Sequence, residues 1–196
     1  MKKYLFVHIP KTGGDCLKTN LSIDSNFIYT KHKNINTLGR QFKLKCYFKF
    51  AFVRNPWDRF ISAYFYLKQA GIDPNHEWSR DIWKSNIINN DFDTFSKFVR
   101  SGVWKTFGWF HFWPQYSFIV NRRCKDIGID FIGRFENLQE DFDKVCKHIG
   151  LPPQKLIPTN TSRHKHYTEY YNEDTKKIIA DYYRKDIEYF RYEFKN

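Results

Sequence analysis

The sequence contains no long hydrophobic run, and its cysteines are few and scattered. No apolar stretch among the 196 residues reaches the roughly 18 positions that a membrane-spanning helix needs. The four cysteines form no Cys-x-x-Cys pair, which argues against a zinc site and against a disulfide framework. The first ten residues lack the longer apolar core and the cleavage site of a signal peptide. We therefore expect a soluble, cytoplasmic protein with no membrane span.

The composition also argues against a disordered chain. Hydrophobic residues make up 41% of the sequence and aromatic residues 20%, which is enough for an apolar core. The length suits one domain with a sizeable core and is short for two. Because no internal repeat or linker is visible, we predict a single domain over residues 1–196.

Positive charge is concentrated in the first quarter of the chain. The formal net charge is +12, and residues 1–50 hold ten Lys or Arg against two Asp, a surplus of +8. One interpretation is a solvated basic surface, and the other is a face for a polyanionic ligand. The sequence carries no zinc finger, basic zipper or RNA-recognition signature, so we do not expect nucleic acid as the partner.

The order of predicted strands and helices indicates an α/β fold. Apolar, β-branched or aromatic runs predict strands at 4–9, 27–29, 46–53 and 130–135. Helical patterns cover 16–20, 34–40, 56–67, 92–99, 138–149 and 172–189. Cap residues are expected at Asp15, at Asn55 before Pro56, at Asn137 with Glu140 as a capping box, and at Asn172. The aromatic run at 102–120 is expected to be half buried and mainly part of the core, with stacking on sugar rings as the alternative. Strands that alternate with helices favour a parallel sheet, with ligands at the carboxyl ends of its strands.

The turn after the first strand has the properties of a phosphate cradle. Lys11 supplies a full positive charge, and Gly13 and Gly14 let backbone N–H groups turn toward an anion at a helix start. An ordinary tight turn with an exposed Lys is the alternative. The order of residues does not fit a Walker A loop, in which the Lys follows the glycines.

Two segments taken together resemble the nucleotide sites of the sulfotransferases that use 3′-phosphoadenosine-5′-phosphosulfate. Residues 7–14, Val-His-Ile-Pro-Lys-Thr-Gly-Gly, are similar to the 5′-phosphosulfate loop of that superfamily. Arg54 at a strand end and Ser62 in the following helix are similar to its 3′-phosphate site. Residues 131–138 and 160–164 resemble the carbohydrate branch, sulfotransferase family 2, which includes heparan 2-O-like members. The resemblance implies a P-loop-like three-layer fold with a central, mainly parallel sheet flanked by helices.

The resemblance also implies a role for particular residues. Lys11 would hold the 5′-phosphosulfate and stabilise the oxygen that leaves. Arg54 would bind the 3′-phosphate through its planar fork. Phe135 would lie near the adenine, with plain core packing as the alternative. The implied donor site comprises Lys11, Thr12, Gly13, Gly14, Asp15, Cys16, Arg54, Ser62, Phe135, Ser162 and Arg163.

Histidine is the residue type best suited to take a proton from the acceptor hydroxyl near neutral pH. His32 directly follows the second strand, where glycan sulfotransferases similar to this chain carry their base. We predict His32 as the base, with His111, in its aromatic surroundings, as the alternative. No acidic pair beside the loop is suited to magnesium, so we expect no metal.

Asp15 and Cys16 depart from the resembled pattern. Relatives usually carry Thr or Ser at these two places, where a hydroxyl donates to the phosphate. A carboxylate repels a phosphosulfate unless it turns away, and a thiol is a poor donor. We predict that the Asp15→Thr substitution tightens nucleotide binding.

The sequence therefore favours an enzyme that moves a sulfuryl group from the adenosine donor to a hydroxyl group. The resemblance to the carbohydrate branch implies that this hydroxyl belongs to a glycan. Two alternatives remain open: a non-enzymatic polyanion-binding domain, which the +8 surplus fits, and an ATP-dependent, P-loop-like kinase. No pattern in the sequence indicates the oligomeric state.

Overall fold

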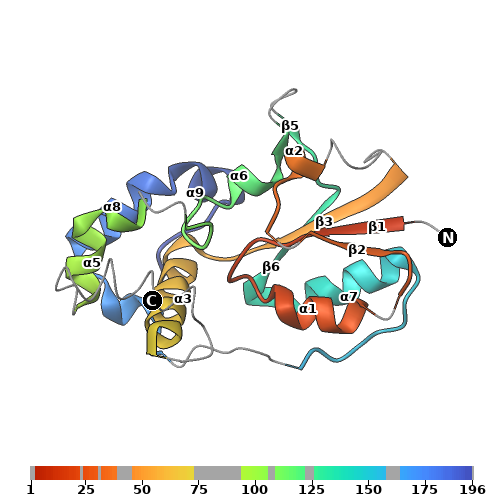
Figure 1. The fold of residues 1–196 in the computed structure, drawn as a ribbon, viewed down its shortest axis with the longest axis horizontal. Helices are drawn as coiled ribbons and strands as arrows, with labels where there is room; N and C mark the ends of the chain where they lie inside the picture. The colour runs from red at the N-terminus through yellow and green to blue at the C-terminus, as the bar shows by residue number, and fades with distance from the viewer. Residues whose placement is uncertain are drawn as a thin grey trace. The chain divides into compact units, whose positions relative to one another are not determined.

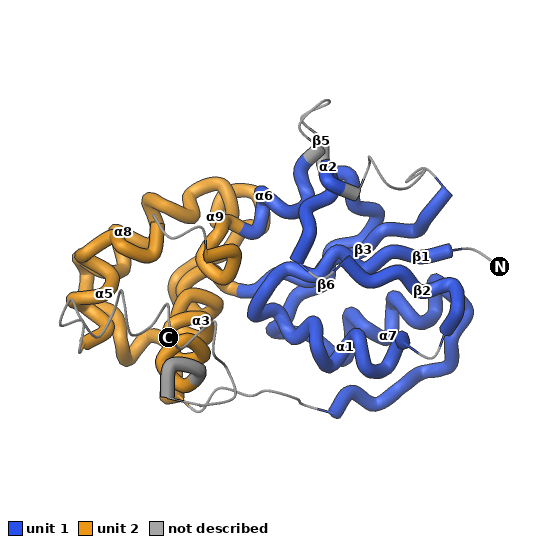
Figure 2. Tube along the Cα trace, viewed as in Figure 1, with its two compact units in different colours: residues 1–54, 115–161 blue, residues 55–114, 162–196 orange. Residues whose placement is uncertain are grey.

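A computed structural model describes residues 3–22, 24–30, 32–38, 46–72, 94–105, 109–121, 126–157 and 164–195 (Figure 1). The chain forms two compact units, each built from two separate segments (Figure 2). The first unit comprises residues 1–54 and 115–161, and the second comprises residues 55–114 and 162–196. The single domain expected over 1–196 stays a prediction beside this organisation.

The first unit is centred on a parallel sheet of four strands. In spatial order these are β2 (Phe27–Tyr29), β1 (Lys3–Val7), β3 (Tyr47–Val53) and β6 (Phe131–Arg134). β1 pairs with β3 as far as Val7 and Ala51, and β3 pairs with β6 as far as Val53 and Arg134. The expected α/β fold, with a central, mainly parallel sheet flanked by helices, is confirmed.

Two helices cover one face of this sheet, as Figure 1 shows. They are α1 (Gly14–Leu21) and α7 (Leu138–Ile149). Because side chains alternate across a strand, every second residue of β1 and β3 points to these helices. The resulting core consists of Tyr4, Phe6, Leu17, Leu21, Phe48, Phe50, Phe52, Phe142, Val145 and Cys146. This packing fixes the start of α1 at the carboxyl end of β1.

Smaller elements complete the first unit. They are α2 (Ile35–Leu38), α6 (Tyr116–Ile119), β4 (Val120–Asn121), β5 (Asp126–Ile127) and the 3₁₀ turn η4 (Phe135–Asn137). β4 and β5 form an antiparallel pair. The Asn36 amide Nδ2 donates to the Val120 carbonyl oxygen over 2.8 Å and joins α2 to β4. The helix expected at 34–40 is confirmed over the four residues of α2; residues 39–40 lie outside the described ranges.

Two helix starts differ from the sequence prediction. The N-cap of α1 is Gly13, in the left-handed conformation, and not Asp15, which lies inside the first turn. Asn137 is the N-cap of α7, but its side chain makes no cap hydrogen bond, so the expected capping box is absent. The Asp141 carboxylate accepts from the Arg134 backbone N–H instead, over 2.8 Å. This bond ties the first turn of α7 to the end of β6.

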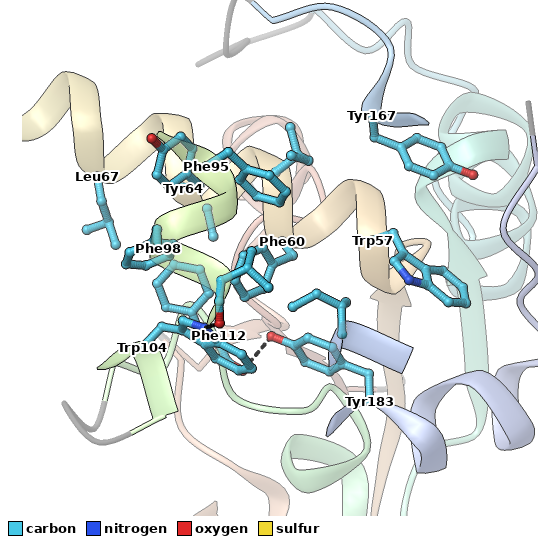
Figure 3. Close-up of a cluster of buried hydrophobic side chains, with 14 of the residues drawn as sticks. Trp57, Phe60, Tyr64, Leu67, Phe95, Phe98, Trp104, Phe112, Tyr167 and Tyr183 are labelled. Atoms are coloured by element: carbon cyan, nitrogen blue, oxygen red, sulfur yellow. Dashed lines mark hydrogen bonds between the residues drawn. The ribbon is translucent and has the colours of Figure 1, made fainter. Parts of the chain in front are cut away.

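The second unit is helical and is packed around aromatic side chains. It contains α3 (Pro56–Ile72), α5 (Phe95–Ser101), the 3₁₀ turns η3 (Val103–Lys105) and η5 (Tyr167–Tyr170), α8 (Glu173–Tyr182) and α9 (Arg184–Phe190). Figure 3 shows Phe60 of α3 among Phe98, Trp104 and Phe112, and a hydrogen bond from Tyr183 Oη to the Phe112 carbonyl oxygen, 2.6 Å long. The expectation that the aromatic run is mainly core is confirmed for Trp104, Trp109 and Phe112, whereas Trp113 is 41% exposed.

The helix starts of the second unit follow the sequence more closely. The Asn55 side chain accepts from the Trp57 N–H over 3.1 Å, so the predicted cap before Pro56 is confirmed. Asn172 forms a full capping box with Thr175. The last helix is divided at Tyr183 into α8 and α9 and does not run unbroken to residue 189. α5 begins after the cap Thr94, and Asp91 and Phe92 lie outside the described residues.

Within the described ranges, no helix combines the length and the apolar character that crossing a membrane requires.

Candidate active site

The loop between β1 and α1 presents backbone N–H groups at the carboxyl end of the sheet. Lys11 and Gly13 both have left-handed backbones, with φ of 67° and 79°. These two turns reverse the chain so that α1 begins at Gly14. The N–H groups of a first helical turn lack intrahelical partners and carry the positive end of the helix dipole. The loop therefore places Lys11 beside a helix start, as an anion cradle requires.

Both glycines of the loop are needed because other side chains come close. A Cβ at Gly14 would lie 2.0 Å from Cδ2 and from Nε2 of His8. A Cβ at Gly13 would lie 2.9 Å from Cδ2 of Leu138 and 3.3 Å from Cδ2 of Phe135. The loop thus packs between His8, which follows β1, and the residues that follow β6. These contacts are the steric reason why glycine is required at both positions.

Arg54 lies directly after β3 and reaches the loop between β1 and α1. Its Nη1 donates to the Lys11 carbonyl oxygen over 3.3 Å, and its guanidinium carbon lies 4.0 Å from the centre of the Phe135 ring. The side chain is 8% exposed. β1 and β3 are neighbours, and the chain leaves them toward opposite edges of the sheet, which is the switch point where α/β folds bind ligands. The structure therefore brings Lys11, Arg54 and Phe135 together.

The side chains of Thr12 and Cys16 make hydrogen bonds to backbone carbonyls, and the side chain of Asp15 is exposed. The Thr12 hydroxyl is fully buried and donates to the Ile9 carbonyl oxygen over 2.8 Å. The Cys16 thiol donates to the Ile157 carbonyl oxygen over 2.9 Å, and burial raises its pKa. The Asp15 side chain is exposed in the first helical turn. The Thr12 hydroxyl and the Cys16 thiol thus donate to backbone carbonyls, which leaves their backbone N–H groups as donors for an anion.

His32 lies beside His8, next to the loop. The two rings are 4.5 Å apart between centres, and His32 has a left-handed backbone with φ of 57°. His8 Nδ1 is 2.6 Å from the Tyr29 hydroxyl oxygen, and the His8 side chain is buried. Burial lowers the pKa of His8 to about 3, with further contributions from His32, Lys11 and Lys18, so the ring is neutral near pH 7. His8 therefore lies between His32 and Gly14 without adding a charge.

The remaining predicted residues lie in the second unit or outside the described ranges. Ser62 is on α3 and is 2% exposed. His111 is buried between Tyr66 and Phe110, with ring centres at 5.2 and 4.3 Å, and its carbonyl oxygen accepts from Arg59. Ser162 and Arg163 lie outside the described residues. Their roles stay predictions.

Sequence reasoning missed Gln115, whose side-chain amide makes two hydrogen bonds to the backbone of Arg54. The Arg54 N–H donates to Gln115 Oε1 over 2.9 Å, and Gln115 Nε2 donates to the Arg54 carbonyl oxygen over 2.8 Å. The only signal in the sequence is a polar residue in a strongly aromatic run. For metal ions, no cluster of three or more suitable His, Cys, Asp or Glu residues exists within the described part of the chain.

Comparison with known proteins identifies the family to which this chain belongs. Residues 2–193 match the model described as Sulfotransferase family, so the chain belongs to that family. The resemblance to its carbohydrate branch is confirmed by two relatives, Carbohydrate sulfotransferase 14 of Danio rerio and Carbohydrate sulfotransferase 9 of Homo sapiens. The first is 28% identical over 139 residues and the second 24% identical over 230.

These alignments cover 65% and 97% of this chain, but only 36% and 51% of the two relatives. The chain thus spans between about a third and about half of the length of the two carbohydrate sulfotransferases. An uncharacterized protein of Archaeoglobus fulgidus is 37% identical over 122 residues, which is 62% of this chain and 82% of that protein. No solved structure matches the chain.

Proposed function

We propose that the chain transfers the sulfuryl group of 3′-phosphoadenosine-5′-phosphosulfate to a hydroxyl group of a carbohydrate by in-line displacement. The observation that carries this proposal is the contact between Arg54 Nη1 and the carbonyl oxygen of Lys11, at 3.3 Å. It joins two cationic residues at the carboxyl ends of neighbouring parallel strands. The proposed donor carries anionic groups at both its 5′ and 3′ positions, so it matches two adjacent cationic sites.

The 5′-phosphosulfate would be held by Lys11 and by the backbone N–H groups at the start of α1. In the transition state, negative charge grows on the oxygen that leaves, and a fixed ammonium group beside it lowers the barrier. Lys11 thus has two roles, one in binding and one in the chemical step. The Asp15 carboxylate is exposed at the same helix start, and its negative charge weakens the attraction for an anion.

Arg54 is well prepared for a phosphate. Its guanidinium carbon lies over the Phe135 ring, 4.0 Å from the ring centre, and its N–H groups are directed outward in the plane of the group. In-plane donors in pairs are the arrangement that recognises phosphate oxygens. By resemblance to the family, Ser62 would also bind the 3′-phosphate, and Ser162 and Arg163 would close over the same nucleotide. Phe135, which the resemblance places near the adenine, serves here as a support for Arg54.

We assign the removal of the acceptor proton to His32. It belongs to the same unit as the loop and lies against His8, which in turn approaches Gly14. His111 remains the alternative base, in the second unit. The carbohydrate acceptor is supported by the two relatives named as carbohydrate sulfotransferases. A cytoplasmic location stays part of the proposal.

Thermal unfolding in the presence of different anions tests this function. A ligand that binds only the folded protein stabilises it by about 2.7 kcal/mol at 100 times its dissociation constant. For a protein of this size that corresponds to a rise in Tm of about 5–11 °C. We expect this rise with adenosine 3′,5′-bisphosphate. A larger response to ADP with Mg²⁺ would favour a kinase, and a response to heparin or DNA alone would favour a polyanion-binding domain.

A further inference from the structure

The side-chain amide of Gln115 continues the hydrogen-bonding pattern of the sheet beyond its last paired residue. The β3–β6 pairing ends at Val53 and Arg134, one residue before Arg54. At Arg54 the Gln115 amide accepts from the backbone N–H over 2.9 Å and donates to the backbone carbonyl over 2.8 Å. Gln115 is fully buried. A single side chain therefore replaces the strand neighbour that Arg54 lacks.

The buried backbone N–H and C=O groups of Arg54 both need the hydrogen bonds that Gln115 provides. Buried backbone N–H and C=O groups almost always have partners, because leaving one without a partner is costly. The Gln115 amide is planar and carries one acceptor and one donor edge, so it fits both backbone groups of one residue at once. The bonds hold the peptide units on either side of the Arg54 Cα and so fix the direction in which this side chain leaves the backbone.

That direction decides where the guanidinium lies. From this fixed Cα, Arg54 reaches both the face of Phe135, at 4.0 Å, and the Lys11 carbonyl oxygen, at 3.3 Å. A small rotation of the backbone at Arg54 is multiplied along its long side chain. We infer that Gln115 is the positioning residue that aims the Arg54 guanidinium at the 3′-phosphate of the donor. This inference rests on the proposed function, because it assigns Gln115 a part in the same nucleotide site.

The test is the preference of the protein for a nucleotide with a 3′-phosphate. Isothermal titration gives the dissociation constants of adenosine 3′,5′-bisphosphate and of adenosine 5′-phosphate. The ratio of the second constant to the first is the preference for the 3′-phosphate and reports that contact alone. In Gln115→Met the side chain keeps its length and loses both hydrogen bonds. We expect the ratio to fall by about tenfold or more, while the affinity for adenosine 5′-phosphate changes by less than about threefold. A general loss of folding would lower both affinities together.

Gln139→Met is a matched control. Gln139 accepts from the Leu156 N–H over 2.9 Å and donates to the Gln154 carbonyl oxygen over 3.0 Å, so its amide also makes one accepted and one donated backbone bond, at an exposed position on α7. We expect it to leave the ratio unchanged. If Gln115→Met is too unstable to titrate, Gln115→Asn keeps an amide that is one methylene too short to hold both groups, and the ratio should fall in the same direction.

The outcomes separate the two hypotheses. A wild-type protein without preference for the 3′-phosphate would overturn the proposed function and this inference with it. A wild-type preference that Gln115→Met and Gln115→Asn both retain would overturn the positioning role of Gln115 alone. An equal loss of preference in Gln139→Met would show that any broken backbone contact in this unit has the same effect, and would also overturn the inference.

Discussion

Replacing Gly14 with Ala should destabilise the protein because the ring of His8 occupies the space of the new methyl group. A Cβ at this position would lie 2.0 Å from Cδ2 and Nε2 of His8 and 2.8 Å from Cε1. The ring cannot swing away freely, because its Nδ1 is 2.6 Å from the Tyr29 hydroxyl and the side chain is buried. The backbone of Gly14 is not left-handed, so the cost comes from the His8 contact and not from backbone strain.

The magnitude follows from two opposing effects. Overpacking a well-filled site costs about 1–3 kcal/mol. Ala is favoured over Gly in a helix by about 0.5–1 kcal/mol, mainly through the entropy of the unfolded chain. In a His8→Ala background the ring is gone, so the same Gly14→Ala substitution should be neutral or stabilising. Because the helix preference for Ala acts in both backgrounds, the two substitutions should be coupled by the overpacking cost alone, about 1–3 kcal/mol, with the double variant more stable than the single effects predict.

Urea unfolding of the wild type, both single variants and the double variant measures this coupling. Gly14→Ala in a Tyr29→Phe background is a graded control, because removing the hydroxyl releases the His8 ring without emptying its site. We expect an intermediate cost there. Single effects that add to within about 0.5 kcal/mol in the double variant would refute the argument, since independent sites behave in that way.

Three further outcomes are expected. His32→Ala should lower kcat by about 10²–10⁴-fold and leave the affinity for adenosine 3′,5′-bisphosphate nearly unchanged; the converse, with His111→Ala inactive and His32→Ala active, would move the base to the second unit. Asp15→Thr should tighten that nucleotide several-fold in a calorimetric titration at low salt, with a smaller gain at high salt because the repulsion is screened; weaker binding would contradict the account. For His8, the pKa of about 3 in the folded protein lies below the 6.5 of an ordinary His, so the unfolded state takes up this proton first. Stability should fall as the pH drops from about 6.5 towards about 3, by up to about 1.4 kcal/mol per pH unit, and His8→Gln should lose this part of the slope in urea unfolding between about pH 7 and pH 5; an unchanged slope would count against a neutral, buried His8.

Features set by neighbouring residues were predictable from the sequence. The near-continuous apolar run of β3 indicated a strand buried on both faces, and its central place in the sheet is confirmed. The caps at Asn55 and Asn172 are local interactions within three residues, and both are present. The loop at Lys11 and the position of Arg54 follow from the strand ends and from the parallel order of β1 and β3. The strand and the caps were predicted correctly because contacts between nearby residues decide them.

Features set by distant residues were not predictable in this way. One local feature was also mistaken: Asp15 has the residue type of a cap, but the left-handed Gly13 takes that position. Asn137 and Glu140 have the spacing of a capping box, yet Asp141 already binds the end of β6. The two bonds between Gln115 and Arg54 join residues 61 positions apart, so no local pattern announces them. The sequence indicated which residue types form the site, and tertiary contacts decided how each is held.

The central claim is that the turn bearing Lys11 and the arginine after β3 together bind the two anionic ends of one adenosine nucleotide. A crystal soaked with adenosine 3′,5′-bisphosphate tests it most directly. We predict electron density with the 5′-phosphate at the start of α1 beside Lys11 and the 3′-phosphate within hydrogen-bonding distance of the Arg54 guanidinium. Nucleotide bound elsewhere, or bound with the 3′-phosphate away from Arg54, would contradict the account.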